Sequence, residues 1–425
     1  MNNIRKHFIM YWCTCSIIVC AIIIFTSTMY AMNLLVPYNP LIRPRASNDQ
    51  IGQFFCMIEA GIGSAIAFNE EKKTNALQIY NTQQNALLML QGFPAGSKQS
   101  DLLAQINPFA SPFDGKRGLF DVTGDFILDA GGGLALRYFI GHGWSINAYL
   151  PFYSMRFKNV RWQDLTQHLT PEDERVHLLL TDMFAANVAQ LGNLSIDDWH
   201  RAGIGDLAIL LDWHRDFPQA KPILKNVAIN ARAGLSAPTG LKSDPNLIMA
   251  IPFGADGAWT LPFALGLELT LCYYVQLGLD VQLIHTFGHT HVERIPSMPC
   301  QTSLLYLQKA CVYHDYGWNQ QFSLYAGITE LPKGFSASIG YQYIKQGDAK
   351  LFPVSNDVST MIIQESPILR DWTLHQIIMR ADYDCKQWLP DSPVSPRIGL
   401  FAQIPFNGKR SILFTTIGGS VSIDF

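Results

Sequence analysis

The sequence predicts an all-β fold, namely an antiparallel up-and-down β-barrel that crosses a membrane with about 12 strands, or 12 to 14. Three observations lead to this prediction. The chain is rich in hydrophobic residues but poor in charge, apolar and polar residues alternate along many segments, and short and long connections also alternate. We expect long outer loops, one of them carrying a helix, and a plug in the barrel.

The composition separates this chain from an ordinary soluble protein. Of its 425 residues, 48% are hydrophobic and 15% are charged, whereas soluble domains contain about 25% charged residues. After the N-terminal leader, no apolar run approaches the roughly 20 residues that a transmembrane helix needs. The net charge of −3 offers no basic face for nucleic acid. Strands along which apolar and polar residues alternate therefore remain as the way to place so many apolar residues.

The N-terminus predicts a signal peptide over residues 1–31. Arg5 and Lys6 form a basic start, an apolar run extends over residues 8–25, and Ala31 is the best cleavage position. An uncleaved N-terminal anchor is the alternative. Residues 32–50 are expected to form a periplasmic tail or part of a plug, and residues 51–425 the barrel.

Alternation with a period of two residues identifies the strands, because successive side chains point to opposite faces. Within 259–272, Leu261, Leu265 and Leu267 share one face, while Gly266 and Glu268 share the other. Several segments reach the 9–11 residues of a tilted membrane strand. The predicted strands are 51–68, 119–140, 144–157, 202–214, 223–236, 259–272, 276–290, 318–328, 335–346, 372–384, 397–405 and 411–425.

The connections are expected to be short on the periplasmic side and long on the outer side. The outer ones are 69–118, 158–201, 237–258, 291–317, 347–371 and 406–410. An even strand number places both chain ends in the periplasm. Gly131-Gly132-Gly133 leaves open a turn inside 119–140, and a change of phase near Pro151 predicts a bulge there.

Two outer segments are expected to be helical. Thr170-Pro171-Glu172-Asp173 has the cap, the proline and the acidic first turn of a helix start, within the loop 158–201. The second is 81–91, in the long loop or plug 69–118.

The last residues resemble the C-terminal β-signal of bacterial outer-membrane proteins. Thr416, Gly418, Val421 and Ile423 occupy the signal's spacing, and the chain ends on Phe425. The resemblance implies recognition by the barrel-assembly machinery. It also implies a location in the outer membrane of a Gram-negative bacterium, with outer-membrane lipid around the barrel.

Charged residues on the polar faces are expected to line the barrel lumen. They form either a structural network that keeps a filled barrel rigid or a polar lining that selects solutes. They are Asp121, Asp125, Arg137, Asp206, Asp212, Arg232, Glu268, Asp280, Arg380 and Asp382.

Histidines and cysteines give weaker signals. His289 and His291 have the spacing of metal ligands, with His285 and Glu293 on the same parity. That face is expected to meet lipid, so we interpret these residues as histidines of the aromatic belt at the membrane interface and not as metal ligands. Neither a metal nor another cofactor is predicted. Cys300 and Cys311 fall in one outer loop and are expected to form a disulfide bond.

These observations favour a channel or uptake protein for small solutes, some of them hydrophobic. The long first loop with a plug is similar to that of the fatty-acid and aromatic-hydrocarbon channel family. This sequence departs from the family because it lacks an N-terminal Asn-Pro-Ala hatch motif. A structural or adhesion barrel that acts through its outer loops is the alternative. Enzyme motifs such as Gly-x-Ser-x-Gly and His-Glu-x-x-His are absent, so an outer-membrane hydrolase is the least favoured function.

Overall fold

The structure is a computed structural model that describes residues 39, 41–42, 51–70, 72–108, 110–331, 334–355, 358–387 and 392–425. The predicted signal peptide, 1–31, lies outside these residues. Among the helices in the described part, none is long and apolar enough to cross a membrane.

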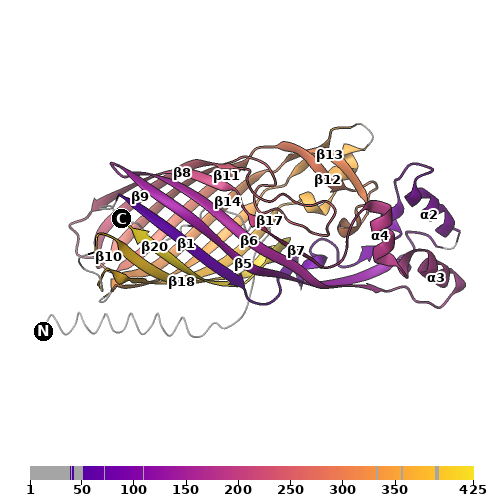
Figure 1. The fold of residues 1–425 in the computed structure, drawn as a ribbon, viewed down its shortest axis with the longest axis horizontal. Coiled ribbons are helices and arrows are strands. Elements are labelled where there is room, and N and C mark those ends of the chain that lie inside the picture. Colours follow the sequence, from indigo (N-terminus) through magenta and orange to yellow (C-terminus); the bar gives the residue numbers. More distant parts are fainter. Residues whose placement is uncertain are drawn as a thin grey trace.

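Twelve strands close into one antiparallel barrel, seen from the side in Figure 1. Each barrel strand pairs with its neighbours in chain order, and the last strand pairs with the first. The barrel strands are β1 (Gly52–Gly61), β5 (Leu119–Gly141), β6 (Trp144–Asp164), β8 (Leu207–Pro218), β9 (Leu224–Ala237), β10 (Thr260–Leu271), β11 (Val275–Thr286), β14 (Trp318–Leu331), β15 (Phe335–Gln346), β17 (Trp372–Asp384), β18 (Ser395–Lys409) and β20 (Thr416–Asp424). Both the fold class and the strand count are confirmed. Gly131-Gly132-Gly133 lies inside β5 and does not form a turn.

The outer connections carry the remaining elements, at the barrel end away from the C-terminus (Figure 1). The short strands are β2 (Ile66–Asn69), β3 (Lys72–Asn75), β4 (Gln84–Asn85), β7 (Trp199–Ile204), β12 (His289–Ile295), β13 (Gln308–Asp315), β16 (Lys350–Pro353) and β19 (Ser411–Leu413). The helices are α2 (Lys98–Ile106), α3 (Pro171–Val176), α4 (Phe184–Gly192) and α5 (Thr360–Gln364), with a π-helical turn at His177–Thr181 and 3-10 turns at Ala76–Gln78, Leu88–Leu90, Ser303–Leu305, Pro367–Leu369 and Cys385–Gln387.

One helix prediction is confirmed and the other is wrong. Thr170 and Asp173 form a capping box at the start of α3. Residues 81–91 contain β4 and a 3-10 turn in place of the expected helix. The Asn85 side chain accepts hydrogen bonds from the backbone N–H groups of Leu87 and Leu88, which favours a turn over a helix. The helix of this loop is α2.

The outer surface of the barrel wall is apolar. Leu265 is 66% exposed and Leu267 41% exposed, and many other large apolar side chains face outward beside them. Aromatic residues such as Trp144, Tyr273 and Trp318 lie near the strand ends. An exposed apolar band flanked by aromatic residues is the lipid-facing surface of a membrane barrel.

The wall reverses its facing pattern where it leaves the membrane. In β5, Leu134 and Leu136 face outward, whereas Phe126 and Leu128, which have the same parity, are buried inside. A β-bulge between Leu128 and Ala130 inserts one residue and exchanges the two faces. The β5–β6 pairing does shift register near the bulge predicted beside Pro151, between Ser154 and Met155, but the extra residue is Asp129 in β5, and the β6 side chains alternate there without interruption.

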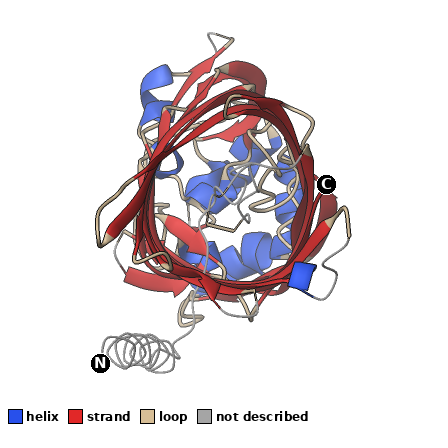
Figure 2. Cartoon of the chain, turned by 90° about the vertical axis from the view of Figure 1, so that its left-hand side faces the viewer, coloured by secondary structure: helices blue, strands red, loops and turns tan. Residues whose placement is uncertain are grey.

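The outer elements form their own hydrophobic core above the membrane. Phe126 of β5 stacks on Phe157 of β6 with ring centroids 4.3 Å apart, and Phe414 and Trp199 contact Phe126 edge-on. Figure 2, a view along the barrel from its short-turn end, shows helices and loops across the far mouth. The outer loops therefore cap the barrel as one packed layer.

The C-terminal strand closes the barrel between β1 and β18. Val421 and Phe425 point outward, as the predicted alternation requires. Gly418 faces the lumen under the ring of Phe401, where an added Cβ would lie 2.4 Å from Phe401 Cζ. Close packing therefore explains the glycine of the β-signal pattern, and recognition by the assembly machinery stays a prediction. Leu413, placed on this strand from the sequence, belongs instead to β19.

Replacing Leu267 by Arg should impair assembly of the barrel in membranes. Leu267 lies on the lipid face, paired with Ile229 and Leu279, and an arginine at mid-bilayer costs roughly 2–4 kcal/mol. The measurement is the heat-modifiable, folded fraction in lipid vesicles. Thr123→Arg is the matched control, because Thr123 is exposed above the bulge. Equal folding of both variants would contradict the assigned lipid face.

Candidate functional site

The barrel interior holds a network of paired charges. Arg232 donates two hydrogen bonds to Asp280, at 2.8 and 2.9 Å, and both side chains are buried. Arg137 Nη2 lies 3.7 Å from Asp212. Arg380 donates to Asp382 from two nitrogens, one of them at 2.6 Å. Because every one of these charges has a partner, the network favours a rigid, filled interior over a wide aqueous pore.

Two further predicted lumen residues also lie inside. Glu268 accepts a hydrogen bond of 2.7 Å from the Tyr325 hydroxyl. Asp206 is buried just before β8, at the outer end of the barrel, where it accepts backbone hydrogen bonds from Gly240 and Ala255. Asp206 thereby holds the loop between β9 and β10 against the barrel mouth.

Asp121 and Asp125 do not line the lumen, so their predicted placement is wrong. Asp125 accepts a hydrogen bond from Asn159 in an exposed pair, and Asp121 accepts one from Gln78. Both precede the bulge in β5, where the odd-numbered residues face outward and the even-numbered residues are buried. The inserted residue changes which residues of β5, odd-numbered or even-numbered, face inward. The sequence alternates uniformly through this point, so the change cannot be read from it.

Sequence reasoning missed polar lumen residues on β1. Glu59 accepts hydrogen bonds from Gln403 at 2.9 Å and from Thr416 at 2.7 Å, and Gln53 donates to Asp424 at 2.7 Å. These bonds join β1 to β18 and β20 across the closing seam. The shared parity of Gln53 and Glu59 in the first strand was the available signal.

A short N-terminal segment lies inside the barrel. Leu41 and Ile42 are buried, and they belong to an apolar cluster that includes the inward-facing Phe55 and Phe401. Asn39 donates a hydrogen bond of 3.3 Å to Gln342 on β15. Asn39, Leu41 and Ile42 therefore lie inside the barrel, and the other residues of 32–50, for which a periplasmic tail or part of a plug is predicted, lie outside the described residues.

A cavity of about 390 Å³ lies between the barrel mouth and the outer loops. Ser236, Thr260 and Ile284 line it from the outer ends of β9, β10 and β11. The loop segment 243–256 contributes about a third of the lining residues, including Leu247 and Ile251, and the other outer loops contribute most of the rest. The cavity therefore joins the outer end of the lumen to the loop layer, and its lining combines apolar residues with charged ones such as Glu293 and Arg294.

His289 and His291 do not lie on the lipid face, so the preferred interpretation of these residues is wrong. Barrel strand β11 ends at Thr286, and β12 begins at His289 in a separate sheet with β13 and β16. Only His285 fits the expected belt, because its ring lies 4.9 Å from the Trp318 ring. The change of strand at Phe287-Gly288 turns the later residues away from lipid.

Glu293 joins His291 and His314 in the β12–β13–β16 sheet. Its Oε2 atom lies 3.3 Å from His291 Nε2 and 3.3 Å from His314 Nδ1. Burial alone would raise the pKa of Glu293, but the two neighbouring histidines lower it to about 2. Glu293 is therefore an anion between two imidazoles.

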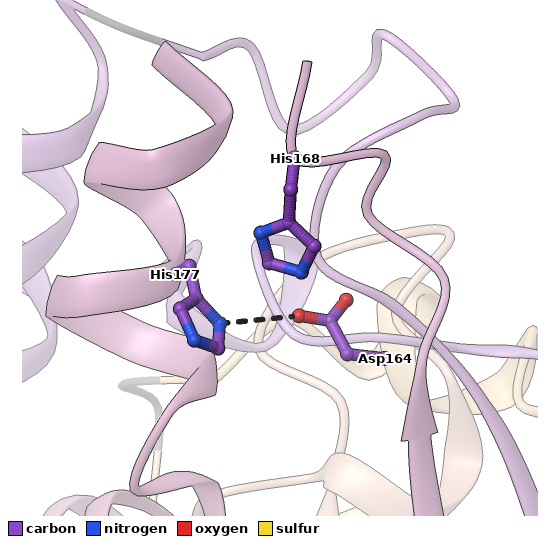
Figure 3. A group of neighbouring side chains, drawn as sticks. All are labelled: Asp164, His168 and His177. Carbon is purple, nitrogen blue, oxygen red and sulfur yellow. Dashed lines mark ion pairs between the residues drawn. The ribbon is translucent and has the colours of Figure 1, made fainter. Parts of the chain in front are cut away.

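A second His and Asp cluster lies at the loop helix (Figure 3). His177 Nδ1 is 3.7 Å from Asp164 Oδ2, and His168 stacks edge-on against His177. Thr181 donates a hydrogen bond of 2.6 Å to the same Asp164 oxygen. The cluster is thus already hydrogen-bonded, and His168 is exposed.

Cys300 and Cys311 are both free and exposed, so the predicted disulfide bond is not present. Cys311 pairs with Val292 in the β12–β13 ladder, whereas Cys300 occupies a turn with a positive φ of 66°. Membership of one loop did not bring the two thiols together, because folding places them in different local structures.

Among solved structures, this chain is similar to several outer-membrane barrels, each at low sequence identity and with a TM-score below 0.5. An outer-membrane channel from Pseudomonas putida F1 has a TM-score of 0.49 and 10% identity, over 91% of this chain and 99% of that chain. The P. putida toluene transporter TodX has a TM-score of 0.33 and 9% identity, over 93% and 94%. A FadL homologue from Pseudomonas aeruginosa has a TM-score of 0.30 and 9% identity, over 94% and 98%.

These neighbours include proteins of the channel family that the long first loop resembles. With TM-scores below 0.5, the likeness does not assign a function to this chain. No protein-family model matches the sequence, and no curated protein matches it.

Replacing both Leu41 and Ile42 by Asp should increase ion conductance across planar bilayers. Two carboxylates cannot remain in the apolar cluster with Phe55 and Phe401 without a large desolvation cost, so the segment should leave the lumen. Ile51→Asp is the control, since Ile51 is 65% exposed. Conductance equal to that of the wild type would show that this segment does not close the lumen.

Proposed function

We propose that this protein is an outer-membrane uptake channel for small solutes with a largely apolar body. The cavity at the outer end of the lumen carries the proposal. It has a volume of about 390 Å³, and apolar loop residues such as Leu247, Ile248 and Ile251 line it together with polar and charged residues that include Asp244, Arg294 and Arg370. A concave site in which apolar surface surrounds convergent polar groups is typical of small-molecule binding.

The position of the cavity supports uptake over simple binding. Ser236 and Thr260 line it from the outer ends of β9 and β10, which supports a position between the outer loops and the barrel interior. Below it, the paired charges and the segment with Leu41 and Ile42 occupy the lumen. A solute would bind first in the cavity and would pass only when the N-terminal segment moves.

The surroundings of the barrel support an outer-membrane location. The apolar belt requires lipid, and barrels of this kind satisfy every backbone group without exposing a strand edge. The C-terminal strand with its final Phe425 supports delivery by the barrel-assembly machinery. No described residue set suggests a hydrolytic site, and the proposal assigns no enzymatic activity.

Ala250→Trp should reduce binding of a small apolar fluorescent probe by about tenfold, equivalent to about 1.4 kcal/mol. Ala250 is buried in the cavity wall, so the indole would occupy space that the solute needs. Ala189→Trp, on the exposed side of α4, is the matched control. Binding is measured with the refolded protein in detergent, and uptake with protein-containing vesicles.

These measurements distinguish an uptake channel from a structural or adhesion barrel. Loss of both binding and uptake in Ala250→Trp alone supports the channel. A wild-type protein that neither binds the probe nor admits it into vesicles would overturn the proposal. That result would favour a structural or adhesion barrel, for which the packed core of the outer loops is the supporting observation.

A further inference from the structure

The strongest unexplained feature outside the barrel is the face of the outer sheet that carries His291, Glu293 and His314. His291 and Glu293 are two residues apart on β12, so their side chains point to the same side. His314 lies on the neighbouring β13, opposite His289. The sheet thereby gathers two imidazoles and one carboxylate from two strands.

Two of the three separations between these groups match a metal coordination shell. Zinc bonds to nitrogen and oxygen of about 2.0–2.1 Å in a tetrahedron place the ligand atoms roughly 3.3 Å apart. Glu293 Oε2 lies 3.3 Å from both His291 Nε2 and His314 Nδ1. One ligand atom from each residue lies within 4.8 Å of the others.

The same atoms lack hydrogen bonds. His291 Nε2, Glu293 Oε2 and His314 Nδ1 are buried, and apart from their ion-pair contacts with one another at 3.3 Å none has a hydrogen-bond partner among the residues that the structure describes. A buried polar atom without a hydrogen bond destabilises the folded state, and more so when the atom is charged. One cation between the three atoms would satisfy them together.

Neighbouring groups position the ligands and set the charge. The His314 ring stacks on Tyr316 at 3.8 Å, and the His291 ring stacks on His289 at 4.7 Å. Asp256 Oδ2 lies 3.7 Å from His291 Nε2 and accepts a hydrogen bond from the Ser243 hydroxyl. With neutral imidazoles, Glu293 and Asp256 supply two negative charges, which suits a divalent cation.

We propose that His291 Nε2, Glu293 Oε2 and His314 Nδ1 bind a divalent transition-metal ion of the zinc class. Imidazole and carboxylate ligands suit this class, and a site with three protein ligands keeps one position open. Glu293 and His314 also line the cavity of about 390 Å³. The open position therefore borders the space in which a solute would bind.

The test uses the untagged protein, refolded in detergent, treated with EDTA and titrated with ZnCl₂. Elemental analysis gives the zinc content, and calorimetry gives the affinity. We expect one zinc ion per chain. His291→Ala, Glu293→Gln and His314→Ala should each weaken binding by at least the roughly 10–100-fold that loss of an outer-shell partner costs.

His168→Ala is the matched control, because it removes a histidine from the Asp164–His168–His177 cluster of the same loop layer. Its zinc affinity should equal that of the wild type. Heat-modifiability confirms the folding of each variant, and the isosteric Glu293→Gln keeps the test decisive if an alanine variant does not fold. Co²⁺ in place of zinc should give the absorption of a tetrahedral site in the wild type but not in Glu293→Gln.

Two results would overturn the proposal. One is folded wild-type protein that binds no zinc, and the other is zinc binding that His168→Ala abolishes while Glu293→Gln and His314→Ala do not. Probe uptake is measured separately, so failure of the zinc site leaves the proposed channel function intact, and the reverse also holds.

Discussion

The hydrogen bonds between β20 and β1 are the interaction on which the whole structure depends. Hydrocarbon offers no partner for a backbone N–H or C=O group, so a sheet in lipid is stable only when it closes. Residues 53–61 of β1 pair with residues 416–424 of β20, and this ladder joins the two ends of the barrel. Glu59 adds side-chain bonds to Gln403 and Thr416 at the same seam. The first and last barrel strands therefore have to pair before the barrel has no unpaired strand edge in the membrane.

The membrane boundary decides which side of each strand is apolar. Inside the bilayer the outer face meets lipid and the lumen holds paired polar groups such as Arg232 and Asp280. Above the bilayer the outer face meets water, and the inner face packs into a core around Phe126 and Phe157. In β5 a single bulge reconciles the two requirements, because one inserted residue exchanges the faces while the apolar residues keep their spacing.

Above this reversal lie the cavity and the β12–β13–β16 sheet that carries His291 and His314. The outer core holds the loops over the barrel mouth, and Asp206 holds the loop between β9 and β10 through the N–H groups of Gly240 and Ala255. The cavity lies beneath these loops, and the strands β12 and β13 place Glu293 and His314 at its edge. The polar lumen below is occupied by its own network and by Leu41 and Ile42. The cavity and the occupied part of the lumen therefore lie at different levels of the molecule.

The sequence by itself determined the barrel, because lipid imposes a local rule that every membrane strand obeys separately. Alternation around Leu265 and Leu267 and the alternating loop lengths were sufficient for the strand number and order. The same local chemistry identified the capping box at Thr170 and Asp173.

Tertiary structure alone decided the rest. Whether Asp125 faces lumen or water depends on a bulge, whether Cys300 meets Cys311 depends on their turns, and whether His291 meets His314 depends on which strands pair. The sequence could not predict these contacts because they join residues far apart in the chain. The outer loops also lie in water, where no bilayer requires apolar side chains on one face and polar side chains on the other.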